Sequence, residues 1–138
     1  MAFSVAQHCV LVVDILKLDY GVTEKAILLK GLLHDAAEAY MGDVIRPVKN
    51  AMPTYKPAEK RLLAVIVEKF TGTPVVPPVV KKADDMALFT ERRDVLGIAT
   101  SGEISSRLQV GRISPDLAKN RFLDTFRELY EETQGNGK

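Results

Sequence analysis

Four side chains that can bind a metal ion or transfer a proton lie close together in the sequence: His34, Asp35, Glu38 and Asp43. The preceding residues, 26–33, have helical rather than alternating periodicity. His34 and Glu38 are four positions apart, so we expect them on one face of a helix. A metal ion against that face could take His34 and Asp35 as ligands and leave Glu38 one turn away to handle a proton.

Taken singly, each of these residues is more often a buried histidine or a charge near a helix end. Together they indicate more, because His34 and Asp35 directly follow two leucines. A polar pair at such a position is costly to bury unless it is paired or bound to a metal. Charged residues are rarely fully buried without a partner.

Length and composition set the class of protein. The 138 residues are enough for one domain with a core, and 46% hydrophobic with 27% charged residues is typical of a soluble globular protein. A net charge of +1 argues against a nucleic acid polymer or an anionic membrane as the main partner. No apolar run is long enough to span a membrane. A single cysteine and the lack of a recognisable signal peptide lead us to expect a cytoplasmic protein.

The first half of the chain predicts two helices and a loop. Residues 4–18 have apolar side chains at three- and four-residue spacings, with Ser4 as the cap. The core positions predicted for this helix are Val5, Cys9, Val12, Val13 and Leu16. A second helix, from 23 to about 41, is expected to carry the His-Asp pair. Residues 43–53 lose the period and gain prolines, which predicts a functional loop that carries Asp43, Arg46 and Lys49.

The second half predicts three more helices. They run over residues 55–70, 79–96 and 115–132, with a looser connection over 97–111 that could hold a short helix. The middle one places Asp84, Leu88 and Glu91 on one stripe and Val80, Ala83 and Ala87 on the next. The last is expected to pack through Leu117, Ala118, Phe122, Phe126 and Leu129. No segment has a convincing strand pattern, so the predicted fold is all-α.

His8 and His34 are the two histidines of the chain, and each adjoins residues that suit a metal site. With Asp84 on a later helix, the order is a His, then a His-Asp pair, then a distant Asp. In this order the sequence resembles the HD-domain metal-dependent phosphohydrolases. More narrowly, it is similar to the bacterial 5'-deoxyribonucleotidase branch and its phage deoxynucleotide phosphohydrolase relatives. The narrower resemblance is carried by residues 4–8, 32–43, 47–49 and 80–84.

The resemblance implies a single HD domain over residues 1–138, an all-α bundle of about five to six helices. It also implies one divalent ion, with four ligands: His8, His34, Asp35 and Asp84. Two imidazoles and two carboxylates suit Mn, Co, Zn, Fe or Ni better than Mg. Four ligands leave two positions of an octahedral ion for a water and a phosphate oxygen. Without further histidines, a mononuclear site is favoured.

Glu38 and Asp43 match the positions that act on protons in the deoxyribonucleotidase branch. Glu38 would orient or deprotonate the attacking water, or protonate the leaving 5'-oxygen. The alternatives are a helix-surface carboxylate for Glu38 and a cap or loop carboxylate for Asp43. The candidate phosphate contacts are Arg46, Lys49, Lys81 and Lys82. Among them Lys49 is preferred, because it lies in the matching Pro-Val-Lys loop.

The chain departs from the family pattern at its start. Relatives usually have a preceding helix and loop that bring an arginine, often near a tryptophan, to the substrate phosphate. Here seven residues precede His8 and there is no tryptophan. We therefore expect that the N-terminal helix of the family is missing or shortened, that another cation such as Lys49 takes over the task of the arginine, or that substrate binding is impaired. This departure bears on phosphate recognition more than on metal binding. An uncovered part of the core would also favour self-association, in line with the homodimer that the resemblance implies.

Four functions are consistent with these patterns. The first is a metal-dependent phosphohydrolase that releases phosphate from deoxynucleoside 5'-monophosphates, a small-molecule nucleotide substrate. The second is a deoxynucleoside triphosphate phosphohydrolase. The third is a non-catalytic HD module that binds a nucleotide or a partner. The fourth is a plain helical interaction domain, in which alanine at His34 would change nothing.

Overall fold

A computed structural model describes residues 4–36, 46–94, 106, 108 and 110–136, and all regular secondary structure in these ranges is helical. The prediction of an all-α bundle of five to six helices is confirmed. The described helices are α1 (Val5–Leu18), α2 (Lys25–Leu33), α4 (Arg46–Ala51), α5 (Tyr55–Thr71), α6 (Pro78–Asp94) and α7 (Pro115–Asn136). None of them combines the length and apolar character that crossing a membrane requires.

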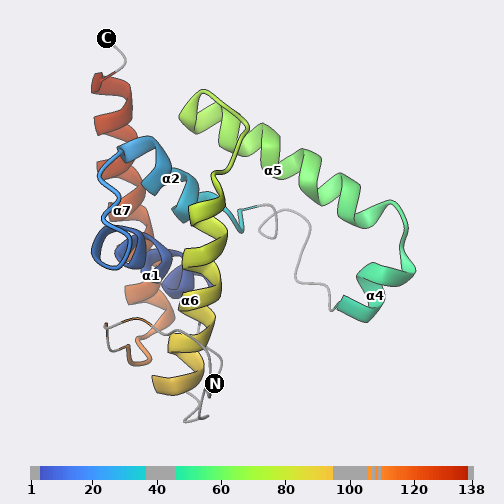
Figure 1. Ribbon diagram of the computed structural model, residues 1–138, viewed down its shortest axis with the longest axis horizontal. Helices are drawn as coiled ribbons and strands as arrows, with labels where there is room; N and C mark the ends of the chain where they lie inside the picture. The colour runs from blue at the N-terminus through green and yellow to red at the C-terminus, as the bar shows by residue number, and fades with distance from the viewer. Residues whose placement is uncertain (1–3, 37–45, 95–105, 107, 109, 137–138) are drawn as a thin grey trace.

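Helix α1 lies at the centre and packs against α2, α6 and α7 (Figure 1). Its start is as predicted, because the Ser4 hydroxyl accepts a hydrogen bond from the Gln7 N–H at 3.1 Å. The α1 side chains with at most 1% exposure are Val12, Val13, Ile15 and Leu16. Val5, predicted to be in the core, is 51% exposed. Helical periodicity indicates which face of α1 is buried. Val5 is exposed because it lies in the first turn, at the end of the part of α1 that neighbouring helices cover.

Helix α2 is shorter than predicted. It ends at Leu33, and residues 34–36 form a turn in which the Ala36 N–H donates to the Leu33 carbonyl at 2.8 Å. The His34 Nδ1–H donates to the Gly31 carbonyl at 2.6 Å. That carbonyl would accept the N–H four residues on in a continuing helix, so the side chain competes with the helical ladder. The expectation that a helix runs through His34 and Asp35 is therefore wrong.

Helices α6 and α7 complete the core around α1. Val80, Ala83 and Ala87 of α6 have at most 1% exposure, which confirms the predicted stripe. In α7, Ala118 and Leu129 are buried as predicted, and Phe122 and Phe126 pack against the core. Leu117, predicted to pack, is 42% exposed. It precedes the buried Ala118 in the first turn of α7, where one step along the helix turns a side chain by about 100°.

Helix α4 corrects the prediction of a loop over residues 43–53, because residues 46–51 are helical. Its Pro47 suits a first helical turn, where the missing N–H has no partner to lose. A helix of six residues is too short to show periodicity, so its sequence reads as a loop. Helix α5 ends at Thr71 and is capped by Gly72, which has a left-handed backbone with φ of 87°. Figure 1 shows α5 reaching outward from α2, with α4 below its outer end.

Candidate metal centre

His8, His34, Asp35 and Asp84 meet where α1, the end of α2 and α6 come together. One ligand atom from each of the four lies within 4.8 Å of the others. The packing of α1 against α6 places His8 beside Asp84, and the turn after α2 adds His34 and Asp35. The structure thus brings together the four residues that the sequence nominated as ligands, across a separation of 76 positions between His8 and Asp84.

Asp84 is the acceptor that both histidines share. Its Oδ1 lies 2.7 Å from His8 Nε2 and 3.0 Å from His34 Nε2. Asp35 Oδ2 lies 3.2 Å from His34 Nε2 and 3.9 Å from His8 Nε2. Ligands bound at about 2.1 Å to one ion are about 3 Å apart when adjacent and about 4 Å apart when opposite. These four separations are therefore in the range expected between ligands of one transition-metal ion.

The other nitrogen of each ring also has a partner. His8 Nδ1–H donates to Glu91 Oε1 at 2.6 Å, and His34 Nδ1–H donates to the Gly31 carbonyl at 2.6 Å. Both rings consequently turn Nε2 toward the carboxylates of Asp35 and Asp84. Sequence reasoning did not select Glu91 as a site residue. The available signal was its position seven residues after Asp84, on the same stripe of α6.

The site is more open on its carboxylate side. The side chains of His8 and His34 are each 10% exposed, whereas those of Asp84 and Asp35 are 18% and 30% exposed. A ligand from solvent would therefore approach past Asp35. The histidines form the inner wall, against the helix core.

The charges of the cluster compensate one another. Burial by itself lowers the pKa of His8, but its hydrogen bonds to Asp84 and Glu91 raise that pKa to about 9. Burial likewise opposes the charge on His34, whose bonds to Asp35 and Asp84 raise its pKa to about 10. Burial raises the pKa of Asp84, but the two histidines hold it well below its usual range. Because a metal ligand must be deprotonated, an ion would displace the Nε2 protons from both rings.

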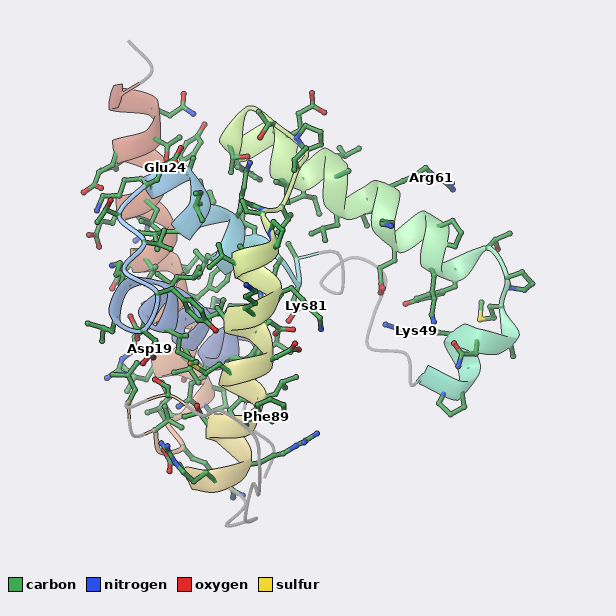
Figure 2. All side chains as sticks on the ribbon, in the orientation of Figure 1. Asp19, Glu24, Lys49, Arg61, Lys81 and Phe89 are labelled. Carbon is green, nitrogen blue, oxygen red and sulfur yellow. The ribbon has the colours of Figure 1, made fainter. Side chains whose placement is uncertain are left out.

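The remaining predicted site residues are Glu38, Asp43, Arg46 and Lys49. Glu38 and Asp43 lie outside the described residues. Arg46 is the first residue of α4, and Lys49 of the same helix pairs with Glu59 of α5 at 3.2 Å. Figure 2 shows Lys49 on the α4–α5 side of the molecule, apart from Lys81 on α6. The structure thus does not bring Lys49 to the ligands.

Lys81, a candidate phosphate contact, does lie near the ligands. Its Nζ is 3.8 Å from Asp84 Oδ2 and 3.0 Å from Asp85 Oδ1, and its side chain is 73% exposed. It is one turn before Asp84 on α6. A cation is thus present on the solvent side of the ligand set.

A cavity of about 290 Å³ lies elsewhere, against α1, α7 and residues 108–113. None of the four ligands lines it. Asp14, Arg112 and Arg121 are at its edge and are exposed. The cavity and the metal cluster are separate features, and the chemistry of the donor atoms identifies the cluster as the candidate site.

Comparison with known proteins finds two relatives. The uncharacterized protein YfdR of Escherichia coli (strain K12) is 34% identical over 137 residues, which cover 94% of this chain and 72% of YfdR. An uncharacterized protein of Rhodobacter capsulatus is 35% identical over 105 residues, 71% of this chain and 53% of that protein. No protein-family model matches the chain.

Proposed function

We propose a function for this chain as a member of the family of YfdR, to which it belongs. The chain is a divalent-metal-dependent phosphohydrolase of the HD type that releases phosphate from deoxynucleoside 5'-monophosphates. The observation that carries this proposal is the meeting of two imidazoles and two carboxylates from three parts of the chain. The names of the relatives state no activity, so the support comes from these side chains and from the order of the motifs.

His8, His34, Asp35 and Asp84 would hold one ion of Mn, Co, Zn, Fe or Ni. The donor set fits such an ion, because mixed nitrogen and oxygen ligands suit these metals. The ion would supply Lewis acidity, which lowers the pKa of a water and neutralises charge on the phosphoryl group. The chain contributes orientation, since both rings have their Nδ1 bonded elsewhere and keep Nε2 for the ion.

Proton transfer is assigned to Glu38, with Asp43 as the second proton-handling group. Glu38 follows His34 by four positions and Asp35 by three. In this role Glu38 takes a proton from the attacking water or delivers one to the leaving 5'-oxygen. Both assignments rest on the motif.

Recognition of the phosphate requires a cation on the open side of the site. Lys81 is in place for this, because its Nζ lies 3.8 Å from the outer oxygen of Asp84. An incoming phosphate would attract Lys81 away from Asp84 and Asp85 by charge. Lys49 and Arg46 remain the contacts proposed from the motif. The net charge of +1 supports a small phosphate ester as the substrate in preference to a nucleic acid polymer.

The test is phosphate release from a panel of deoxynucleoside mono- and triphosphates. The protein is stripped of metal and given Mn, Co, Zn or Mg, beside Glu38→Ala and the control Lys119→Gln, an exposed lysine of α7. We expect release from monophosphates with Mn or Co, reduced by about 100-fold or more in Glu38→Ala and unchanged in Lys119→Gln. Triphosphate released from deoxynucleoside triphosphates would identify the alternative enzyme. No release from metal-loaded protein would contradict an enzymatic role.

A further inference from the structure

We propose that Glu91 is a positioning residue of the metal centre, which sets the orientation of His8 through the ring nitrogen that faces away from the ion. This inference rests on the metal site of the proposed function. It concerns a residue that the motif order does not include.

Helix α6 holds both nitrogens of the His8 ring. Glu91 follows Asp84 by seven residues, so the two side chains leave the helix at nearly the same azimuth and about 10 Å apart along its axis. The His8 ring from α1 lies between them. Its Nε2 is 2.7 Å from Asp84 Oδ1 and its Nδ1 is 2.6 Å from Glu91 Oε1. A ring held at both nitrogens has little freedom to turn.

Glu91 is not placed to be a fifth ligand. It bonds the ring nitrogen remote from the other carboxylates, and it is not part of the group whose ligand atoms lie within 4.8 Å of one another. Its bond to Nδ1–H instead leaves Nε2 as the nitrogen for the ion. An acceptor on the far nitrogen also makes the bound nitrogen a stronger electron donor.

The contact is shielded from solvent. The Glu91 side chain is 12% exposed and that of His8 is 10% exposed. A carboxylate at this depth is costly without a hydrogen-bond donor, and His8 supplies one. A short bond that involves a charged acceptor is also stronger than a neutral one. The pair can therefore hold its geometry against thermal motion better than a surface contact.

His34 provides the internal comparison. Its Nδ1–H donates to the main-chain carbonyl of Gly31, a partner that no side-chain substitution removes. His8 depends on a side chain for the same task. Substitution of Glu91 thus releases one ligand ring while the other remains held, and we expect weaker metal binding with the fold retained.

The experiment measures metal affinity instead of turnover. Mn²⁺ and Co²⁺ are titrated by calorimetry into the metal-free wild type, Glu91→Ala, Glu91→Gln and the control Glu128→Ala, which removes an exposed carboxylate of α7. We expect Glu91→Ala to weaken binding by about 10- to 100-fold. Glutamine has the side-chain length of glutamate and an acceptor oxygen. Glu91→Gln should therefore weaken metal binding less than Glu91→Ala does, but still several-fold. Glu128→Ala should bind the metal as the wild type does, and Glu91→Ala should alter the absorption spectrum of bound Co²⁺.

The outcomes separate this inference from the proposed function. Wild-type affinity and an unchanged Co²⁺ spectrum in Glu91→Ala would overturn the positioning role and leave the metal site standing. No binding by the wild type would overturn the site and the role together. Thermal unfolding of the metal-free variants reports on the fold. If Glu91→Ala does not fold, Glu91→Gln decides: a several-fold loss supports the role, and wild-type affinity overturns it.

Discussion

At the scale of single residues, the cluster is organised around one oxygen. Asp84 Oδ1 accepts from Nε2 of both histidines, and Glu91 and Asp35 add one further carboxylate to each ring. Without a metal, protons on the two rings offset part of the negative charge of the three carboxylates. With a metal, the ion would take over that charge. The same side chains therefore serve as an ion-pair network or as a ligand set, depending on whether an ion is bound.

The raised histidine pKa values predict how the metal-free protein responds to pH. The pKa of His8 is about 9 and that of His34 about 10 in the fold, against 6.5 as the ordinary value. Their stabilising effect is complete below about pH 6.5 and is lost as the pH rises through 9 to 10. The lowered pKa of Asp84 adds stability above about pH 4, which is lost on acidification. The metal-free protein should thus be most stable between about pH 4 and 6.5.

Chemical denaturation at a series of pH values measures this effect. Between pH 6.5 and 9 we expect a loss of the order of a few kcal/mol in the free energy of unfolding. The decrease in the free energy of unfolding per pH unit should be smaller in His8→Gln, which removes one titrating ring. A stability that stays level or increases between pH 6.5 and 9 would contradict the predicted charge state of the cluster.

At the scale of elements, Gly31 links packing to the site. A Cβ built on Gly31 would lie 2.5 Å from Leu16 Cδ1, so α1 and α2 approach each other closely there. Leu16 is fully buried and has little room to move. The carbonyl of Gly31 holds the His34 ring. A larger residue at position 31 would therefore disturb both the helix contact and a candidate ligand.

We expect Gly31→Ala to lower the free energy of unfolding by about 1–2 kcal/mol. The added methyl group overpacks the core at a cost of about 1–3 kcal/mol, which exceeds the gain of up to about 1 kcal/mol from alanine in a helix. Gly111→Ala is the control, because a Cβ there meets nothing within 4 Å. The free energy of unfolding of Gly111→Ala should differ from that of the wild type by no more than about 0.5 kcal/mol. Equal stability of the two variants in urea would show that the α1–α2 contact adapts freely.

Local sequence predicts the helices better than the contacts between them. The Ser4 cap and the buried stripe of α6 with Val80, Ala83 and Ala87 follow from residue type and spacing. The sequence does not predict α4, because six residues contain too little periodicity. It does not predict the end of α2, because that end involves a hydrogen bond from the His34 side chain to the main chain. The contact of Glu91 with His8 depends on how α1 docks on α6, which periodicity within one helix does not specify.

At the scale of the whole molecule, the candidate site joins parts of the chain that are distant in sequence. Its ligands come from α1, the turn after α2, and α6, and the apolar core they share lies directly behind the histidines. An ion that binds only the folded state would stabilise this arrangement of helices. The single-domain organisation and the homodimer stay predictions. The proton-transfer roles of Glu38 and Asp43 likewise stay predictions.

The most direct test of the metal centre is an anomalous difference map from crystals grown with Mn²⁺. Data collected on both sides of the manganese edge locate the ion independently of any activity. We expect one strong peak per chain within about 2.3 Å of His8 Nε2, His34 Nε2 and an oxygen of each of Asp35 and Asp84. A map with no peak among these four side chains, from protein saturated with Mn²⁺, would contradict the account.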